Sequence, residues 1–140
     1  MKKLIALLLT LTAIFVCCGC FGPSKEELAK DHFFFENKTG VQIDGLHISS
    51  KSASTWGEKV NEEPINVGAS VNFQQSKLVD GNATYDFGAI DHDGLNYDVY
   101  DVTISVGDTI TLSKDDDEAV VTVTAMDGTS KEYRGETYKN

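Results

Sequence analysis

Hydrophobic and polar residues alternate along most of the chain after residue 31. Ile65, Val67, Ala69, Val71 and Phe73 all occupy odd positions, with polar or small residues between them. The same period of two recurs in residues 100–106, 109–113 and 119–125. Because successive side chains of a β-strand point to opposite faces of a sheet, this period indicates strands with one buried and one solvent-exposed face. We therefore expect an all-β domain.

Turn-forming sequences separate the alternating runs. Asp-Gly pairs at positions 80, 93 and 127 and the Asn37–Gly40 segment are typical of hairpin turns. This spacing predicts a single antiparallel β-sandwich of about eight strands. The expected strands are 33–37, 41–49, 65–75, 83–90, 95–105, 108–113, 119–126 and 130–138. Ile43 and Leu46 have opposite parity, so a β-bulge at Asp44-Gly45 is needed to keep both on one face.

One short helix is expected before the first strand. Ser24 can cap its start, and Glu27 three residues later completes a capping box. A polar linker is the alternative interpretation of this stretch.

The first twenty residues have the pattern of a targeting signal. Met1-Lys2-Lys3 is a cationic start, residues 4–16 form an apolar or hydroxyl run, and Gly19-Cys20 follows. This segment resembles the signal peptide of bacterial lipoprotein precursors, although that family usually has Leu where Cys17 stands. The resemblance implies that Cys20 carries a lipid and becomes the new N-terminus. An uncleaved membrane anchor over residues 4–21 is the alternative.

The resemblance divides the chain into three parts. Residues 1–19 are the expected signal peptide, 20–31 the lipidated tether with its short helix, and 32–140 the β-sandwich domain. The tether reaches at most ~40 Å. We therefore expect an extracytoplasmic protein, lipid-anchored to a bacterial membrane and close to it.

Several short motifs of the body follow one another in a characteristic order. They are Asn37-x-Thr39-Gly40, the run from Ile43 to Ser49, Trp56-Gly57, Gly68-x-Ser70 and Asp91-x-Asp93-Gly94. In this order they resemble a group of small secreted or lipid-anchored bacterial β-domains, over residues 33–112. The resemblance implies a β fold outside the cytoplasm and carries no biochemical function.

Charge and cysteine content narrow the function classes. Among 140 residues, 12 are Lys or Arg and 22 are Asp or Glu, which gives a formal net charge of −10. Nucleic acid needs cationic partners for its phosphates, so we expect no nucleic-acid binding. All three cysteines lie between positions 17 and 20, which leaves the body without a disulfide framework.

Acidic turns are the candidates for a metal site. Calcium takes six to eight oxygen ligands from such loops. The candidate ligands are Asp91, Asp93, Asp98, Asp115 and Asp117. The alternative is that these residues make soluble hairpin turns. Under the calcium hypothesis, Asp93→Asn loses both metal and stability.

Trp56 is the candidate for contact with a ligand or partner. It lies in the longest irregular segment, 50–63, where it can stack on a sugar, anchor a protein partner or cover one open end of the core. The chain has no G-x-S-x-G elbow and no glycine-rich phosphate loop. We therefore expect a non-enzymatic binding or protein-interaction module of the cell envelope with a protein or carbohydrate partner. A calcium-dependent binding domain, an envelope hydrolase and an inhibitor remain as alternatives.

Overall fold

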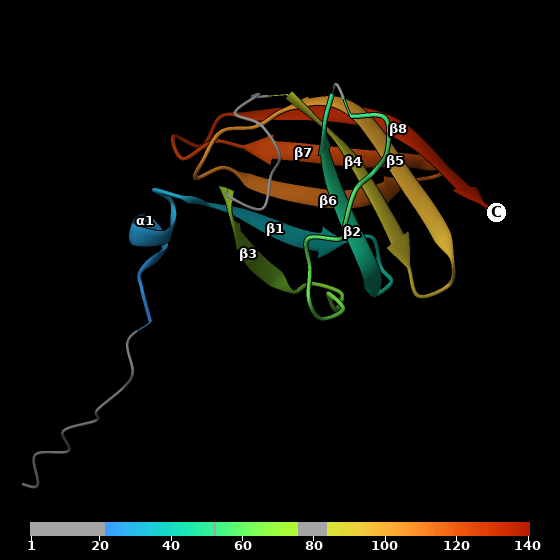
Figure 1. The fold of residues 1–140 in the computed structure, drawn as a ribbon, viewed down its shortest axis with the longest axis horizontal. Coiled ribbons are helices and arrows are strands. Elements are labelled where there is room, and N and C mark those ends of the chain that lie inside the picture. The colour runs from blue at the N-terminus through green and yellow to red at the C-terminus, as the bar shows by residue number, and fades with distance from the viewer. Residues whose placement is uncertain (1–21, 52, 76–83) are drawn as a thin grey trace, which may run out of the picture.

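The computed structural model describes residues 22–51, 53–75 and 84–140, in which one short helix and eight strands follow one another (Figure 1). Cys20 and the predicted turn at 80–82 lie outside these residues. The elements are α1 (Lys25–Leu28), β1 (His32–Lys38), β2 (Ile43–Ser50), β3 (Ser70–Gln74), β4 (Thr84–Asp91), β5 (Leu95–Thr103), β6 (Thr109–Asp115), β7 (Glu118–Thr124) and β8 (Ser130–Lys139). The predicted all-β class and eight strands are confirmed. No helix among the described residues is long and apolar enough to cross a membrane.

The predicted helix is present as the four-residue α1. The Ser24 side chain accepts a hydrogen bond from the backbone of Glu27, and Glu27 accepts one from the backbone of Ser24. This reciprocal capping box satisfies donors that a helix start otherwise leaves free. Lys25 places its ammonium 4.9 Å from the centre of the Phe34 ring, which is only 7% exposed. The helix therefore covers the end of β1.

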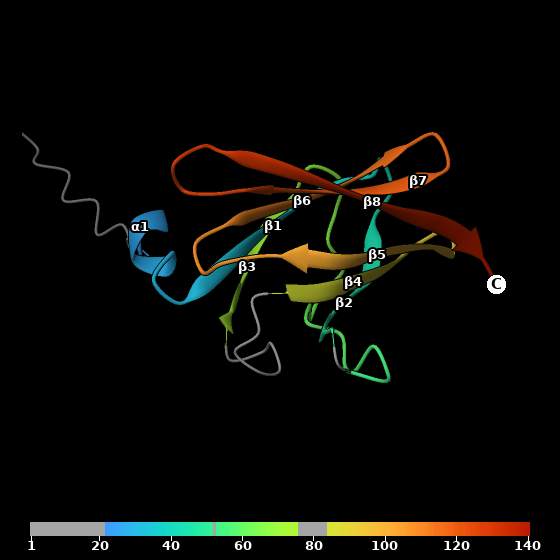
Figure 2. The ribbon, with the colours of Figure 1, turned by 90° about the horizontal axis from the view of Figure 1, so that it is seen from above.

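The strands form one sheet, in the order β2-β4-β5-β8-β7-β6-β1-β3. The predicted antiparallel sandwich is corrected in two respects. First, β1 lies between β6 and β3, and it runs parallel to β6. Second, the sheet is continuous and curls into a half-barrel, so that β2, β4 and β5 lie across β1, β6 and β7 (Figure 2). Alternation records which face of a strand is buried, but it does not record which strands are neighbours.

The curl begins where β5 meets β8. These strands pair over only four residues of each, from Leu95 opposite Lys139 to Asp98 opposite Glu136. At the next position Gly135 lies directly against the Asp98 carbonyl group, where a side chain would collide with backbone. Beyond this point Tyr133 spans the opening between the strands, because its hydroxyl accepts from Thr103 N at 3.2 Å. The glycine permits the close crossing, and the tyrosine replaces the missing backbone pairing.

Two bulges adjust the front half of the sheet. The register between β2 and β4 shifts between Ile43 and Gly45, as the sequence predicts. A second shift, which the alternating pattern does not predict, places an extra residue of β5 opposite the segment from Tyr85 to Phe87. Asp101 lies in this bulge with φ of 58°, and its N–H donates to the Asp86 carboxylate at 2.9 Å. A bulge of this kind re-aims the neighbouring side chain, here Tyr100.

The predicted strand 65–75 is shorter than expected. Ile65 forms a single bridge with Ile43, and the chain then turns through Gly68, whose φ is +74°. Only Ser70–Gln74 is strand. The segment before it, which contains the odd-numbered hydrophobic residues, instead crosses from the edge of β2 to β1. Val67 in this segment is 54% exposed.

Asn37 fixes this crossing from inside the protein. Its side chain is fully buried and donates to the carbonyls of Val41 at 2.8 Å and Ile65 at 2.9 Å. Its carboxamide oxygen accepts from the backbone and hydroxyl of Thr39. Each polar atom of the side chain is bonded, so burial costs it no hydrogen bond. The Asn-x-Thr-Gly motif therefore joins the end of β1 to the crossing.

The core lies inside the curl. One cluster of buried side chains includes residues from β1 through β7, with Tyr133 of β8 packed against it. Phe35, Ile110 and Val121 contribute from one half of the sheet, and Leu46, Phe87 and Val99 from the other. The opposite face of β2, β4, β5 and β8 points away from this core.

We expect Gly135→Ala to destabilise the protein by about 3 kcal/mol, because its methyl group would lie 2.9 Å from Val99 Cα and closer still to the Asp98 carbonyl. The measurement is urea unfolding followed by circular dichroism. Gly22→Ala is the control, since nothing lies within 4 Å of that position. Equal stability of the two variants would contradict the close crossing of β5 and β8.

Candidate functional site

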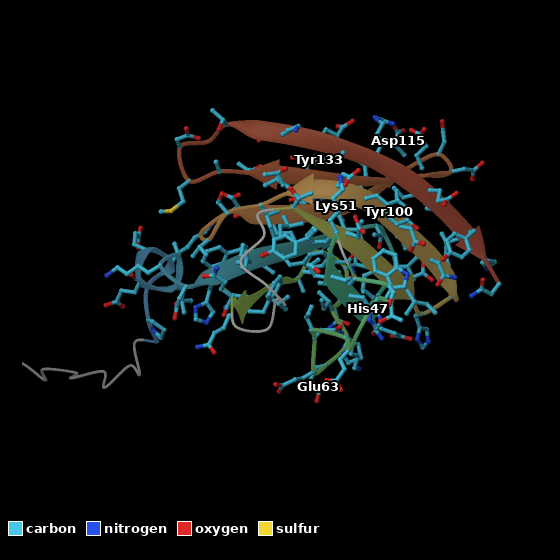
Figure 3. All side chains as sticks on the ribbon, turned by 45° about the horizontal axis from the view of Figure 1, so that its top comes forward. His47, Lys51, Glu63, Tyr100, Asp115 and Tyr133 are labelled. Atoms are coloured by element: carbon cyan, nitrogen blue, oxygen red, sulfur yellow. The ribbon has the colours of Figure 1, made fainter. Side chains whose placement is uncertain are left out.

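The outer face of the sheet carries one continuous row of residues. His47, Gly88, Asp98, Glu136 and Glu118 are successive partners across β2, β4, β5, β8 and β7. Partners in antiparallel strands share a face of the sheet. The row therefore combines a position that has no side chain, Gly88, with three carboxylates. Figure 3 labels His47, Lys51 and Tyr100 on this side of the molecule.

Trp56 lies over the glycine of this row. The chain leaves β2 and runs back over the front of the sheet (Figure 1), which brings the indole ring onto Gly88. A Cβ at position 88 would lie 3.0–3.1 Å from three atoms of that ring. His47 holds the next residue through a contact of 3.2 Å between Nδ1 and the Gly57 carbonyl oxygen. Trp56 remains partly exposed, and it does not cover an open end of the core as one interpretation of the sequence expected.

Tyr100 stands next to Trp56. The ring centres are 5.9 Å apart and the planes are inclined by 31°. Tyr100 is 49% exposed, so much of this aromatic pair faces solvent. Exposed aromatic rings of this kind are typical of surfaces that bind ligands or partners.

Two hollows border the aromatic pair. A hollow of about 180 Å³ is lined by Trp56 and Tyr100 together with Asp86, Ser49 and Thr55. A larger one of about 550 Å³ is lined by the irregular segment and Ile48. Trp56 lines both hollows, and Asp86 lines only the smaller one.

Asp98 anchors the polar part of this face. It is only 5% exposed and accepts hydrogen bonds from the hydroxyls of Tyr138 at 2.9 Å and Tyr100 at 3.2 Å. The hydrogen bond to Asp98 is the main reason that the pKa of Tyr138 rises to about 12. Burial first, and then the charge of Asp98, raise the pKa of Tyr100, with further contributions from Glu136 and Asp86. The negative charge of three carboxylates is therefore felt at the Tyr100 hydroxyl.

The bulge in β5 adds an ion pair to the rim. Lys51, just after β2, places its Nζ 2.6 Å from Asp101 Oδ1. Asp101 raises the pKa of Lys51 through this contact. Both side chains are well exposed, so the pair contributes little to stability. The contact does, however, engage the ammonium group of Lys51.

Asp91, one of the residues predicted as calcium ligands, forms hydrogen bonds inside the β4–β5 hairpin. Asp91 is 3% exposed, and its carboxylate accepts from the backbone N–H groups of Asp93 and Leu95 and from the Tyr97 hydroxyl. It therefore stabilises the β4–β5 hairpin from within. Burial, followed by the contact with Asp91, raises the pKa of Tyr97.

The other acidic candidates lie apart from Asp91. Asp93 is exposed in the hairpin, and Asp98 belongs to the tyrosine cluster described above. Asp115 pairs with Arg134 at 2.9 Å, while the backbone carbonyl of Asp117 accepts from Thr137. Among the described residues, no three His, Cys, Asp or Glu side chains are grouped so that they could hold a metal ion.

The histidines are also dispersed. His92 forms a 3.1 Å contact with Asp44, and both side chains are largely exposed on the hairpin side of β2 and β4. His47 lies on the outer face, as its position in the alternating pattern predicts, and contacts a backbone carbonyl.

The sequence predicts a role for Trp56 but not for its neighbours in the site. Gly88 carried a readable signal, because glycine inside a strand often marks the close approach of another group. Tyr100 and Asp86 carried none, since their proximity depends on the bulge in β5 and on the return of the irregular segment over the sheet.

Comparisons with protein-family models, with curated proteins and with solved structures found no match to this chain.

We expect Asp91→Ala to lower the free energy of unfolding by about 3 kcal/mol, because three donors lose their acceptor inside the hairpin. Asp93→Ala, at an exposed position of the same hairpin, should change it by less than about 0.5 kcal/mol.

Thermal unfolding with millimolar calcium and with chelator tests the calcium hypothesis. A ligand at 100 times its dissociation constant would raise the Tm by roughly 8 °C, and we expect no such rise. A rise that Asp93→Ala abolishes would restore the calcium hypothesis.

Proposed function

We propose that this protein is a lipid-anchored envelope protein that acts by binding a partner on the outer face of its sheet, around Trp56 and Tyr100. The observation that carries the proposal is the aromatic pair itself. Trp56 lies on Gly88, Tyr100 follows at 5.9 Å, and both rings line a hollow. A buried carboxylate holds Tyr100 in place from below.

The preorganised geometry of the pair supports a binding role. Strands β2, β4 and β5 contribute to it. Two hydrogen bonds to Leu46 hold the irregular segment after β2: the Val60 N–H donates to the Leu46 carbonyl at 2.8 Å, and the Asn61 side chain accepts from Leu46 N at 2.8 Å. A surface held in its binding conformation loses less entropy on association. The exposed rings are thus ready for contact without rearrangement of the segment that bears Trp56.

The anchor in this proposal is the lipid on Cys20. The support is the lipoprotein-like order of cationic start, apolar run and Gly19-Cys20 in the sequence. α1 starts five residues after Cys20, so the domain would be held near the bilayer.

We expect Cys20→Ser to abolish incorporation of labelled palmitate when the full-length protein is produced in bacteria. The variant should also keep its leader and migrate as the larger precursor, because processing follows lipidation in the resembled family. Cys18→Ser is the matched control and should be labelled and processed normally. Label retained in Cys20→Ser, or an unlabelled original protein in the membrane fraction, would refute the lipid anchor.

The binding role can be tested through the fluorescence of Trp56, which is the only tryptophan of the chain. The probes are a hexalysine peptide and a chitin tetrasaccharide, one for each expected partner class. We expect at least one probe to give a saturable change that Tyr100→Ala weakens about tenfold. Met126→Ala, at a side chain that is 67% exposed beside α1, should bind normally. If neither probe binds, or if both variants lose binding equally, the proposed site is wrong.

A further inference from the structure

The outer face combines aromatic rings with several carboxylates. Asp86 and Glu136 flank Tyr100 electrostatically, and Asp98 lies beneath it. In the described part of the chain, none of these three carboxylates forms an ion pair. Asp86 acts on the ammonium group of Lys51 only at longer range, where it raises the pKa of Lys51 after the larger effects of Asp101, so the negative charge at the hollow is only partly compensated.

Among the described residues, two cations of this face are already engaged. Lys51 pairs with Asp101 at 2.6 Å. Arg134, further along the outer face, contacts Glu118 at 2.6 Å, Glu132 at 2.8 Å and Asp115 at 2.9 Å. Moving either cation to the hollow would leave another carboxylate unpaired. An external cation can complete the face without this cost.

The aromatic pair favours the same kind of ligand. The faces of Trp and Tyr rings carry partial negative charge, which attracts an ammonium or guanidinium group. A neutral sugar can stack on the rings, but it leaves the carboxylates without a counter-charge. The combination of rings and carboxylates therefore favours a cation over an uncharged ligand.

The size of the acidic hollow indicates one inserted group. Its volume of about 180 Å³ lies below the ~300 Å³ at which typical small-molecule sites begin. It is also open along the face, where the outer row continues through the carboxylates of Asp98 and Glu136. A protruding side chain can occupy the hollow while the rest of its polypeptide follows the acidic row.

We infer that the Trp56–Tyr100 hollow receives a lysine or arginine side chain of a basic polypeptide partner. This inference rests on the proposed binding function and specifies its ligand class. Asp86 supplies the counter-charge at the wall of the hollow, and the two rings contact the cation and its aliphatic stem. The net charge of −10 draws such a partner toward the protein over longer distances.

The test follows Trp56 fluorescence of the full-length protein in a non-ionic detergent during titration with hexalysine. We expect saturable binding that weakens at least tenfold between about 0.05 and 0.5 M salt, because ions screen the attraction. Hexaglutamate and chitin tetrasaccharide should bind at least tenfold more weakly than hexalysine.

Asp86→Asn separates the local site from overall charge. It removes one negative charge and keeps the side-chain oxygen that accepts from Asp101 N, so the bulge is retained. We expect it to weaken hexalysine binding at least fivefold. Asp93→Asn makes the same change of charge on the exposed hairpin and should weaken binding less than twofold. Thermal unfolding of both variants should match the original protein.

Each contrary outcome has a distinct meaning. Equal weakening by Asp86→Asn and Asp93→Asn would show attraction by net charge alone and overturn the inference. Binding of the tetrasaccharide but not of hexalysine, with dependence on Tyr100, would overturn the cation and leave the proposed binding face standing. Failure of both probes would overturn the face as well.

Discussion

The short junction between β5 and β8 is the constraint on which the rest of the structure depends. It joins the two halves of the sheet through only four residue pairs. Gly135 lets the Asp98 carbonyl approach where any side chain would block it, and Tyr133 fills the gap that opens beyond. Because the strands diverge there, β2, β4 and β5 can fold across β1, β6 and β7 and enclose one core. Asn37 secures the other side of the curl through the crossing from β2 to β1.

The same junction builds the candidate site on the opposite face. Asp98 directs its carbonyl toward Gly135 and its side chain toward Tyr100 and Tyr138. One residue therefore contributes to the curl with its backbone and to the acidic aromatic face with its carboxylate. Burial of that carboxylate is tolerated because two hydroxyls donate to it. The fold and the proposed binding face thus share a structural element.

The sequence predicts the strands more completely than it predicts their arrangement. Alternation and turn residues identify all eight strands. The spacing of Ser24 and Glu27 identifies the capping box of α1, and the change of parity identifies the bulge at Asp44-Gly45. Each of these features depends on neighbours in the chain. The parallel pairing of β1 with β6 and the continuous sheet depend on distant contacts that no local pattern records.

The candidate site also has a part that the sequence predicts and a part that it does not. Trp56 could be selected by residue type, whereas its contact with Gly88 and its distance to Tyr100 follow from the curl and the second bulge. The acidic turns had two interpretations, and the bonds of Asp91 favour the structural one.

Charge also bears on how the proposed anchor and the binding face would work together. Loss of residues 1–19 would remove two lysines and no acidic residue, so the anchored protein would carry a net charge of −12. Anionic lipid headgroups repel such a surface, and the repulsion is strongest for the face richest in unpaired carboxylates. The proposed tether through α1 would limit how far the domain can move away. Electrostatic repulsion would therefore turn the row from Gly88 to Glu136 away from the bilayer. The acidity that favours a basic partner at Trp56 would then also keep that face accessible.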